Sequence, residues 1–259
     1  MLFNEDSRVK IPALLTLGKL GFEYLSLKDF TKSLSNQDST TAQSQNPVIT
    51  QPQNLNKDSF GNATLNLENP QSYIFANLFY QSISTLNPHA TPSEIQALLR
   101  DILLEFDYDD LGRTFYERLA NQSGIKLIDF ENFERNSFYA LTELTYKNGD
   151  EEFRPDITLV INGLPLCFIE VKIPHNKEGV LAEQERMQKR FANKKFKKFF
   201  NVLQILVFSN NQEYDDESTA PISGAFYATT ATQNLFLNHF REATPSLNVY
   251  NGGGDINPY

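Results

Sequence analysis

Residues 154–172 read RPDITLVINGLPLCFIEVK, and this stretch decides the fold we expect. Two runs of β-branched and apolar residues flank Asn162-Gly163, which is the strongest short-range signal for a β-hairpin. Three charged residues lie at the outer ends of the two expected strands, and they are Asp156, Glu170 and Lys172. Any joint action of these residues requires that they point to the same face of the sheet.

The length of the hairpin loop decides whether the three side chains share a face. Paired residues on antiparallel strands point to the same face, and side chains alternate along each strand. A two-residue Asn162-Gly163 loop places Asp156 opposite Ile169, so that its carboxylate points away from Glu170. A three-residue loop with Gly163 as a bulge puts Asp156, Glu170 and Lys172 on one face. Such loops are the next most common in hairpins, so we predict a three-residue loop and a shared face.

The expected face carries two carboxylates, which are hard oxygen ligands of the kind that Mg²⁺ prefers alongside water and phosphate oxygens. A bound divalent ion lowers the pKa of its water and shields the charge of a phosphodiester. Lys172 is placed to orient or deprotonate that water, or to balance developing negative charge. The alternative is that the charged residues only mark strand ends, which commonly reach solvent.

The rest of the chain predicts an α/β fold in which helices cover a mixed sheet. Helical spacing of apolar residues indicates helices within 7–25 and 70–119, with Thr91 and Glu94 as an N-terminal capping pair. Pro12 fits the first helix only if that helix bends or begins late. The expected strands are 125–128, 138–146, 157–161, 166–171, 202–208 and 222–230, and a charged helix is expected over about 178–199.

Two segments are expected to lie outside the packed core. Residues 33–66 hold 20 Ser, Thr, Asn or Gln among 34 positions. This composition buries little apolar surface, so the segment is predicted to be a flexible insert or a long loop. The tail, 251–259, contains three consecutive glycines and is expected to be a linker.

The composition predicts a globular protein of the cytoplasm. The chain has 259 residues, of which 40% are hydrophobic, enough to fill a core. Cys167 is the single cysteine, which excludes an intramolecular disulfide, and three scattered histidines provide no zinc set. The acidic N-terminus is unlike a signal peptide, and no apolar run approaches the ~20 residues of a membrane helix. Neither export nor a membrane location is therefore expected.

Residues 155–172 match the PD-(D/E)xK nuclease motif, because Pro155-Asp156 is followed, after thirteen residues, by Glu170-Val171-Lys172. The surrounding segment, above all its Asn-Gly-Leu-Pro-Leu loop, resembles the nuclease segment of the restriction (HsdR) subunit of type I restriction enzymes. The resemblance also covers FANKKFKKFFN at 191–201, QILVFSN at 204–210, NEDSRVK at 4–10 and LGFEY at 20–24. It implies a restriction-endonuclease-like mixed sheet flanked by helices, with an extra helical segment and a polar insert.

The resemblance also implies a domain organisation. Residues 1–250 would form one endonuclease domain, with 33–66 as the polar insert, 70–119 as a helical insert and 120–230 as the catalytic sheet core. Residues 251–259 would lead to an ATP-dependent motor region that this chain lacks. No Gly-x-x-x-x-Gly-Lys-Ser/Thr phosphate loop occurs in the sequence, so ATP would bind only in that absent region.

Family roles carry over to matching positions. Asp156 and Glu170 would hold the divalent metal, with the backbone carbonyl of Val171 as a further ligand, and Lys172 would assist scission. A glutamate on the first helix of the family often approaches the same site, and Glu5 is the candidate for this further metal ligand. The alternative for Glu5 is an acid that interacts with the dipole of a helix start.

The sequence departs from the family at the Gln-x-x-x-Tyr motif that follows the lysine. The apparent alignment places Met187 and Phe191 there. Gln184 and Gln188 lie four residues apart on one helix face, so either is a candidate to replace the family glutamine as a DNA contact. The alternative is that both are solvated helix residues.

Charge is distributed unevenly along the chain. The formal net charge is −9, which by itself argues against a nucleic-acid partner. Residues 172–198 hold nine basic against three acidic residues, a net +6, so the other residues carry −15. This basic segment is expected to neutralise DNA phosphates, although charge runs also form solvated helix faces. The candidate DNA-binding residues are Lys189, Arg190, Lys194, Lys195, Lys197 and Lys198. The acidic runs 107–110 and 213–217 are interpreted as surface.

The leading hypothesis is a Mg²⁺-dependent endonuclease domain of a type I restriction enzyme R subunit. By resemblance, the intact complex would cleave double-stranded DNA after ATP-driven translocation, with methylation and specificity subunits as partners. The alternative is a non-catalytic module of the same fold that holds DNA or docks a subunit through the helices of 70–119. A structural α/β domain with charged strand ends is the third hypothesis.

Overall fold

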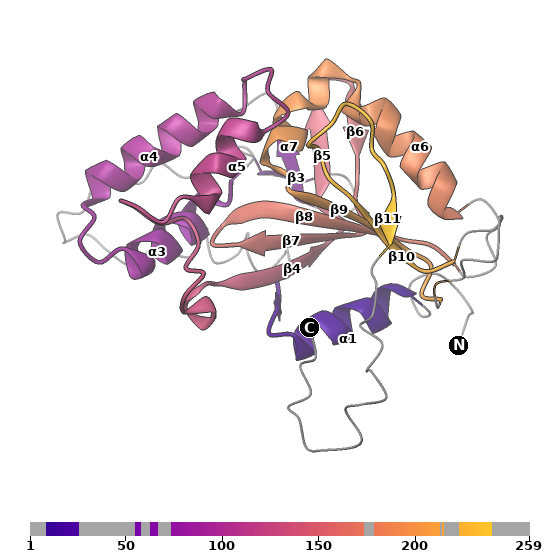
Figure 1. The fold of residues 1–259 in the computed structure, drawn as a ribbon, viewed down its shortest axis with the longest axis horizontal. Helices are drawn as coiled ribbons and strands as arrows, with labels where there is room; N and C mark the ends of the chain where they lie inside the picture. The colour runs from indigo at the N-terminus through magenta and orange to yellow at the C-terminus, as the bar shows by residue number, and fades with distance from the viewer. Residues whose placement is uncertain are drawn as a thin grey trace, which may run out of the picture.

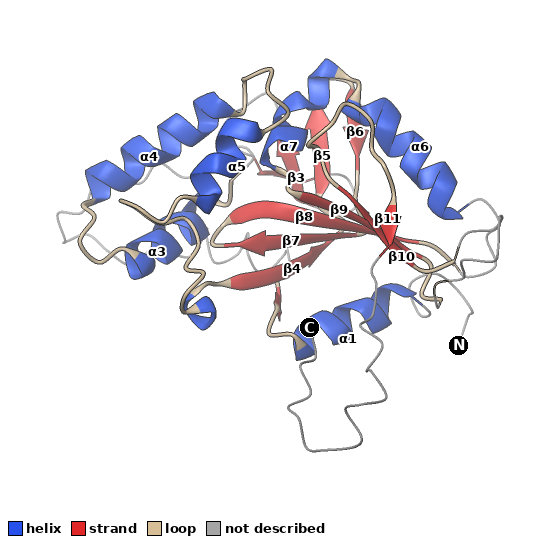
Figure 2. Cartoon of the chain, in the orientation of Figure 1, coloured by secondary structure: helices blue, strands red, loops and turns tan. Residues whose placement is uncertain are grey.

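The computed structural model describes residues 9–25, 55–57, 63–66, 74–173, 179–212, 214 and 223–239. These residues form a mixed α/β structure with a seven-stranded and a four-stranded sheet (Figures 1 and 2). The expected α/β class is confirmed at this level. The tail 251–259 and most of the polar segment 33–66 lie outside the described residues.

The larger sheet has the β7–β8 hairpin at its centre. Its strands, in spatial order, are β1 (Glu23–Tyr24), β4 (Phe138–Thr142), β7 (Ile157–Ile161), β8 (Leu164–Val171), β9 (Ile205–Ser209), β10 (Ala225–Ala228) and β11 (Asn238–His239). The β8–β9 pair is parallel, and a helical connection joins the two strands, as a parallel pair requires. The β1–β4 pair is also parallel, and the remaining pairs are antiparallel.

The smaller sheet contains strands that sequence patterning missed. Its order is β2 (Leu55–Lys57), β3 (Ala63–Asn66), β5 (Thr145–Asn148) and β6 (Glu151–Phe153). The prediction of a long loop is therefore wrong for 55–57 and 63–66, where β3 pairs with β5 by backbone hydrogen bonds that do not require apolar side chains. The single strand expected over 138–146 is divided between the two sheets. Glu143 has a φ of 56°, and this left-handed residue turns the chain out of the larger sheet.

The helices agree with the predicted segments except at their boundaries. They are α1 (Ile11–Lys19), α3 (Ala76–Leu86), α4 (Pro92–Glu105), α5 (Arg113–Ala120), α6 (Gly179–Phe191) and α7 (Lys197–Val202), with short 3₁₀ turns at Phe133–Arg135 and Lys194–Phe196. Pro12 lies in the first turn of α1, where a proline loses no helical hydrogen bond, so the helix begins late. Thr91 and Glu94 form the expected capping box.

Two helix and strand predictions are wrong. The segment 125–128 is not a strand, because its polar backbone groups bond to side chains instead: the carbonyl of Leu127 accepts from Asn162 and the N–H of Lys126 donates to Asn87. The charged helix expected over 178–199 ends at Phe191, and Asn193 caps a new turn by accepting from the N–H of Lys195.

Hydrophobic packing places helices on both faces of the larger sheet (Figure 1). Leu17 of α1 packs with Ala140 and Ile157 on one face. On the other face, Phe168 belongs to the main core with residues of α3–α7. The helices α6 and α7 therefore cover the face of the sheet that carries Phe168. The even-numbered residues at the end of β8 lie on this same face. No helix in the described part of the chain is long and apolar enough to span a membrane.

Candidate active site

The tip of the hairpin is a two-residue loop. Asn162 and Gly163 both have positive φ, 51° and 81°, and Ile161 pairs with Leu164. The three-residue loop is therefore a wrong prediction. Gly163 lies against α3, where an added Cβ would be 2.4 Å from the backbone nitrogen of Phe79, and its carbonyl accepts from the N–H of Phe75. Close helix packing fixes the tight loop.

A bulge within β8 restores the shared face by another route. Val160 pairs with Pro165 but Leu159 pairs with Cys167, so one extra residue lies in β8 between these pairs. From the Leu159–Cys167 pair to the open end of the hairpin, the two residue numbers of each pair sum to 326, as in the Ile157–Ile169 pair. Asp156 and Glu170 continue this register and share a face. The predicted shared face is present, although its cause is the bulge rather than the loop length.

Asp156, Glu170 and Lys172 come together at the open end of the hairpin. The Nζ of Lys172 lies 3.9 Å from Oδ2 of Asp156 and 3.6 Å from Oε2 of Glu170. Asp156 Oδ2 also accepts a 2.9 Å hydrogen bond from the N–H of Val171. The carbonyl of Val171 accepts from Lys172 Nζ at 3.0 Å, so this carbonyl faces the same cluster. The structure thus gathers all four predicted groups of the hairpin.

The cluster has an unusual electrostatic state. Burial, followed by the carboxylates of Glu183 and Asp156, raises the pKa of Glu170 to about 9, while the Lys172 ammonium opposes this shift. A buried carboxyl beside other carboxylates takes up a proton when no further cation compensates them. At neutral pH and without a metal ion, the raised pKa therefore favours the protonated form of Glu170.

The donor set fits a divalent cation of the Mg²⁺ type. Two carboxylates and one backbone carbonyl are hard oxygen donors, and Mg²⁺ usually completes such a set with water and phosphate oxygens. Among the described residues, no group of three or more His, Cys, Asp or Glu side chains is arranged to hold a metal ion. Asp156, Glu170 and the Val171 carbonyl would thus supply only part of a coordination shell. Glu5 lies outside the described residues.

A second lysine approaches the cluster from the start of α1. Lys10 is nearly buried, and its Nζ lies 3.6 Å from Oδ1 of Asp156 and 3.0 Å from Oε1 of Glu143. Glu143 is the left-handed residue between β4 and β5, and its N–H donates to the carbonyl of Asp156. Asp156 is therefore held from both sides, by Val171 through Oδ2 and by Lys10 near Oδ1.

The α6 helix covers the cluster with Glu183. This carboxylate is 1% exposed, and its Oε2 lies 3.5 Å from Lys172 Nζ and 2.8 Å from an Arg186 nitrogen. Its Oε1 lies 3.8 Å from Arg190, whose guanidinium stacks 4.7 Å above the Phe153 ring. The buried cluster therefore extends from the sheet to the helix above it.

Gln184 and Gln188 are engaged within the chain. Gln184 donates to the carbonyl of Leu235 at 2.6 Å, and Gln188 donates to the carbonyl of Gln233 at 3.0 Å. The Oε1 of Gln188 also accepts from the N–H of Leu235. These amides hold the segment before β11 on α6, so neither side chain is simply solvated.

Half of the candidate DNA-binding residues form ion pairs with acidic loops. Lys195 contacts Asp150 and Glu151 at 2.7 and 2.8 Å, Lys197 contacts Asp109 at 2.9 Å, and Lys198 contacts Asp107 at 2.9 Å. Residues 107–109 of the acidic run are exposed as predicted, but Asp107 and Asp109 neutralise part of the basic segment. Lys189 and Lys194 are exposed, and no carboxylate of the described residues lies within ion-pair distance of either.

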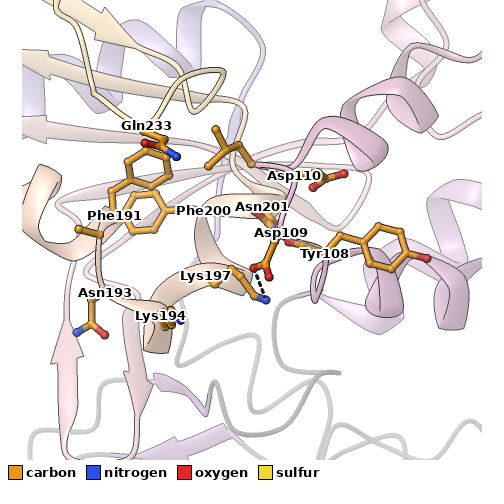
Figure 3. Close-up of a pocket in the computed structure, with 12 residues that line it drawn as sticks. Tyr108, Asp109, Asp110, Phe191, Asn193, Lys194, Lys197, Phe200, Asn201 and Gln233 are labelled. Carbon is orange, nitrogen blue, oxygen red and sulfur yellow. Dashed lines mark hydrogen bonds and ion pairs between the residues drawn. The ribbon is translucent and has the colours of Figure 1, made fainter.

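A cavity of about 460 Å³ lies beside the paired lysines, between the 108–111 loop and the end of α6 (Figure 3). Phe191 and Phe200 form one wall with ring centroids 4.9 Å apart, and the Lys197–Asp109 pair lies on the opposite side. None of Asp156, Glu170 and Lys172 lines it. The cavity is thus separate from the carboxylate cluster.

Comparison with known families shows to which family this chain belongs. The family described as "Type I restriction enzyme R protein N terminus" matches residues 2–215. The chain belongs to this family. The match covers both ends of the carboxylate cluster, from Lys10 to Glu183, and confirms the resemblance to type I restriction subunits.

Curated relatives of this R-protein domain are much longer proteins. It is 27% identical over 230 residues to the putative type I restriction enzyme MjaIXP endonuclease subunit of Methanocaldococcus jannaschii, covering 81% of this chain and 19% of the relative. It is 36% identical over 90 residues to the putative MjaVIIP endonuclease subunit of that organism, covering 33% and 8%. It is 29% identical over 127 residues to the type I restriction enzyme HindI endonuclease subunit of Haemophilus influenzae, covering 42% and 12%. The chain therefore spans less than a fifth of each of these relatives.

Sequence reasoning about this R-protein domain missed Glu183 and Lys10 as members of the cluster. Glu183 had a usable signal, because Val180, Glu183 and Met187 follow helical spacing and all three are buried. A charged residue within an apolar stripe predicts a buried partner. Lys10 gave no comparable signal, since its position depends on how the start of α1 packs against the sheet.

Proposed function

We propose that this chain is the Mg²⁺-dependent nuclease domain of a type I restriction enzyme R subunit, with a restriction-endonuclease-like fold. The intact complex would cleave double-stranded DNA after ATP-driven translocation by a motor region, with methylation and specificity subunits as its partners. One observation carries the proposal: Asp156, Glu170 and Lys172 meet at a buried sheet end in the PD-(D/E)xK arrangement.

Each side chain has a defined task in phosphodiester hydrolysis. Asp156 and Glu170 would hold the metal together with the Val171 carbonyl, and the hydrogen bond from Val171 N–H fixes the Asp156 carboxylate. Bound Mg²⁺ would supply an activated water and neutralise charge on the phosphate. Lys172 would orient the attacking water and balance the negative charge that develops on the scissile phosphate.

The raised pKa of Glu170 is consistent with this role. In the absence of a cation the raised pKa favours a proton on Glu170, and a metal ion would displace it. Metal binding would therefore release a proton near neutral pH. The energetic cost of assembling three acidic groups in a buried site is explained if a divalent cation compensates them in the working enzyme.

DNA would approach over the exposed basic side of α6. Lys189 on α6 and Lys194 in the following 3₁₀ turn are exposed and lie outside the ion pairs that hold Lys195, Lys197 and Lys198. Their ammonium groups are available to contact phosphates, which contributes affinity without sequence specificity.

Plasmid scission by the intact complex tests the proposal. We expect Asp156→Ala and Lys172→Ala to reduce Mg²⁺-dependent cleavage by about 1000-fold, the order associated with loss of a group that stabilises the transition state. DNA-stimulated ATP hydrolysis and translocation should remain, because the motor region is elsewhere. Lys126→Ala, which removes a lysine paired with Glu131 and remote from the cluster, serves as the control.

Wild-type cleavage by both cluster variants would refute the nuclease assignment. If DNA binding were then lost while the complex still assembled, the alternative of a non-catalytic DNA-holding module would be supported. Loss of complex assembly on substitution of exposed residues of α3–α5 would instead support subunit docking by the helical insert.

A further inference from the structure

Glu183 is a buried carboxylate without hydrogen-bond donors that match its two oxygens. Within the described residues, neither Oε1 nor Oε2 of Glu183 has a hydrogen-bond partner, although both lie near cations. A buried charge is costly unless ion pairs compensate it. Some property of the site must therefore offset this cost, since an apolar residue would continue the stripe of Val180 and Met187.

The position of Glu183 relative to Lys172 suggests what offsets the cost of burying the Glu183 charge. Lys172 Nζ is 3.5 Å from Glu183, 3.6 Å from Glu170 and 3.9 Å from Asp156. A divalent cation on Glu170 and Asp156 would use their negative charge and would repel a nearby ammonium. Glu183 belongs to the opposite layer, and its charge would remain available to attract Lys172.

We propose that Glu183 is a positioning residue that holds the Lys172 ammonium beside the metal-binding carboxylates. This inference rests on the proposed nuclease function. The Lys172 ammonium lies at the end of a long flexible stem, and its 3.0 Å contact with the Val171 carbonyl comes from the same strand end as the metal-binding carboxylates. Glu183 provides an anchor from the opposite layer, α6, and the Arg186 and Arg190 guanidinium groups lie 2.8 and 3.8 Å from its oxygens.

Two substitutions in the intact R subunit, assembled with its partners, separate charge from shape. Glu183→Gln removes the charge with little change in volume, and Glu183→Asp retains the charge on a shorter stem. We expect Glu183→Gln to reduce the cleavage rate constant by about 10- to 100-fold, the range for residues that orient a site, while KM for DNA is unchanged. Glu183→Asp should recover part of the rate. Glu185→Gln, an equal charge change at an exposed position of α6, should cleave like the wild type.

A double-mutant comparison distinguishes positioning from a general structural effect. If Glu183 acts through Lys172, Glu183→Gln should cause no further loss when Lys172 is already alanine. Equal fold-losses in both backgrounds, or wild-type cleavage by Glu183→Gln, would overturn the inference. Wild-type cleavage by Lys172→Ala alone would instead refute the proposed nuclease function, and the two failures are thus distinguishable.

The chemical reactivity of Lys172 gives a readout that does not depend on cleavage. Reductive methylation of the metal-free R subunit, followed by peptide mass spectrometry, measures how firmly each lysine amine is held. We expect several-fold faster methylation of Lys172 in Glu183→Gln and an unchanged rate in Glu185→Gln, with Lys126 as the internal reference. An unchanged Lys172 rate in a Glu183→Gln subunit that unfolds at the wild-type temperature would contradict the proposal. A general loss of folding would accelerate Lys126 as well, and this result would also reject a specific effect on Lys172.

Discussion

Two of the regions in which lysines meet carboxylates in this domain are built differently. At the end of the β7–β8 hairpin, Asp156, Glu170 and Glu183 surround Lys172, and the side chains of Glu170 and Glu183 are only 6% and 1% exposed. At 195–198, each lysine pairs with carboxylates on neighbouring loops, and the partner side chain of Lys197, Asp109, is 91% exposed. The first region concentrates buried charge, whereas the second neutralises charge at the surface.

The difference indicates which region is suited to chemistry. Exposed ion pairs cost little and contribute little, because water already solvates both partners. Buried carboxylates lose that solvation, and three of them around one lysine are unfavourable unless additional cations compensate them. Strained or destabilising clusters of this kind are typical of functional sites. The comparison therefore supports the hairpin end as the active site and assigns Lys195, Lys197 and Lys198 mainly to loop attachment.

The largest expected effect is a pH dependence of stability that arises from the buried region. Because the pKa of Glu170 is raised from 4.5 to about 9, the folded state binds a proton more tightly than the unfolded state between these values. Stability of the metal-free domain should therefore fall as pH rises from 5 to 9, by at most about 1.4 kcal/mol per pH unit. Glu170→Gln should flatten this slope and stabilise the domain at pH 8. Chemical denaturation in EDTA measures both effects, and a slope unchanged from the wild type would contradict the assignment.

A buried acid outside the site provides the second test. Glu105 is 5% exposed, and Arg118 donates to both of its oxygens, with Nε at 2.9 and 3.0 Å. We expect Arg118→Ala to lower the free energy of unfolding by about 2 to 4 kcal/mol, because it leaves one buried charge without its partner. Arg113→Ala on the same helix breaks only the exposed pair with Glu117 and should change stability by less than about 0.5 kcal/mol. Similar losses in both variants would remove the distinction between buried and exposed pairs.

DNA affinity tests whether paired lysines are available to phosphates. Replacing Lys189 and Lys194 with glutamine should weaken binding about tenfold at low salt and reduce the salt dependence by about two phosphate contacts. The same change of net charge at Lys195 and Lys197 should leave the salt dependence nearly unchanged. Titrations of the intact complex at several salt concentrations, with Ca²⁺ in place of Mg²⁺, compare the two double variants. A larger effect of the second variant would show that the loop ion pairs open on DNA.

The smallest expected effect concerns the surface pairs themselves. Lys197→Ala removes the contacts with Asp109 and the carbonyl of Asp107, and it should lower stability by less than about 1 kcal/mol. This difference should shrink further in 1 M salt, since mobile ions screen exposed charges. Thermal unfolding at low and high salt provides the measurement. A large, salt-independent loss would indicate that this pair is desolvated like those at the hairpin end.

Several features of the fold were predictable because they depend on neighbouring residues. The position of the hairpin at Asn162-Gly163, the capping box at Thr91 and the helical spacing within 70–119 are local patterns, and the structure contains all of them. The two short strands at 55–57 and 63–66 were not predictable from their polar composition. The first pairs only with the second, and the pairing of the second with β5 depends on backbone groups about eighty positions away.

The candidate site divides in the same way. The sequence by itself determined the residue types and their spacing in Asp156, Glu170 and Lys172, because these lie on one hairpin. Only the tertiary structure decided that a β-bulge, rather than a longer loop, aligns them, since packing of Gly163 against α3 fixes the turn. It also decided that Lys10 and Glu183 join the cluster and that acidic loops neutralise Lys195, Lys197 and Lys198. Electrostatic contacts depend on distances in space, and chain spacing determines those distances only within a local element.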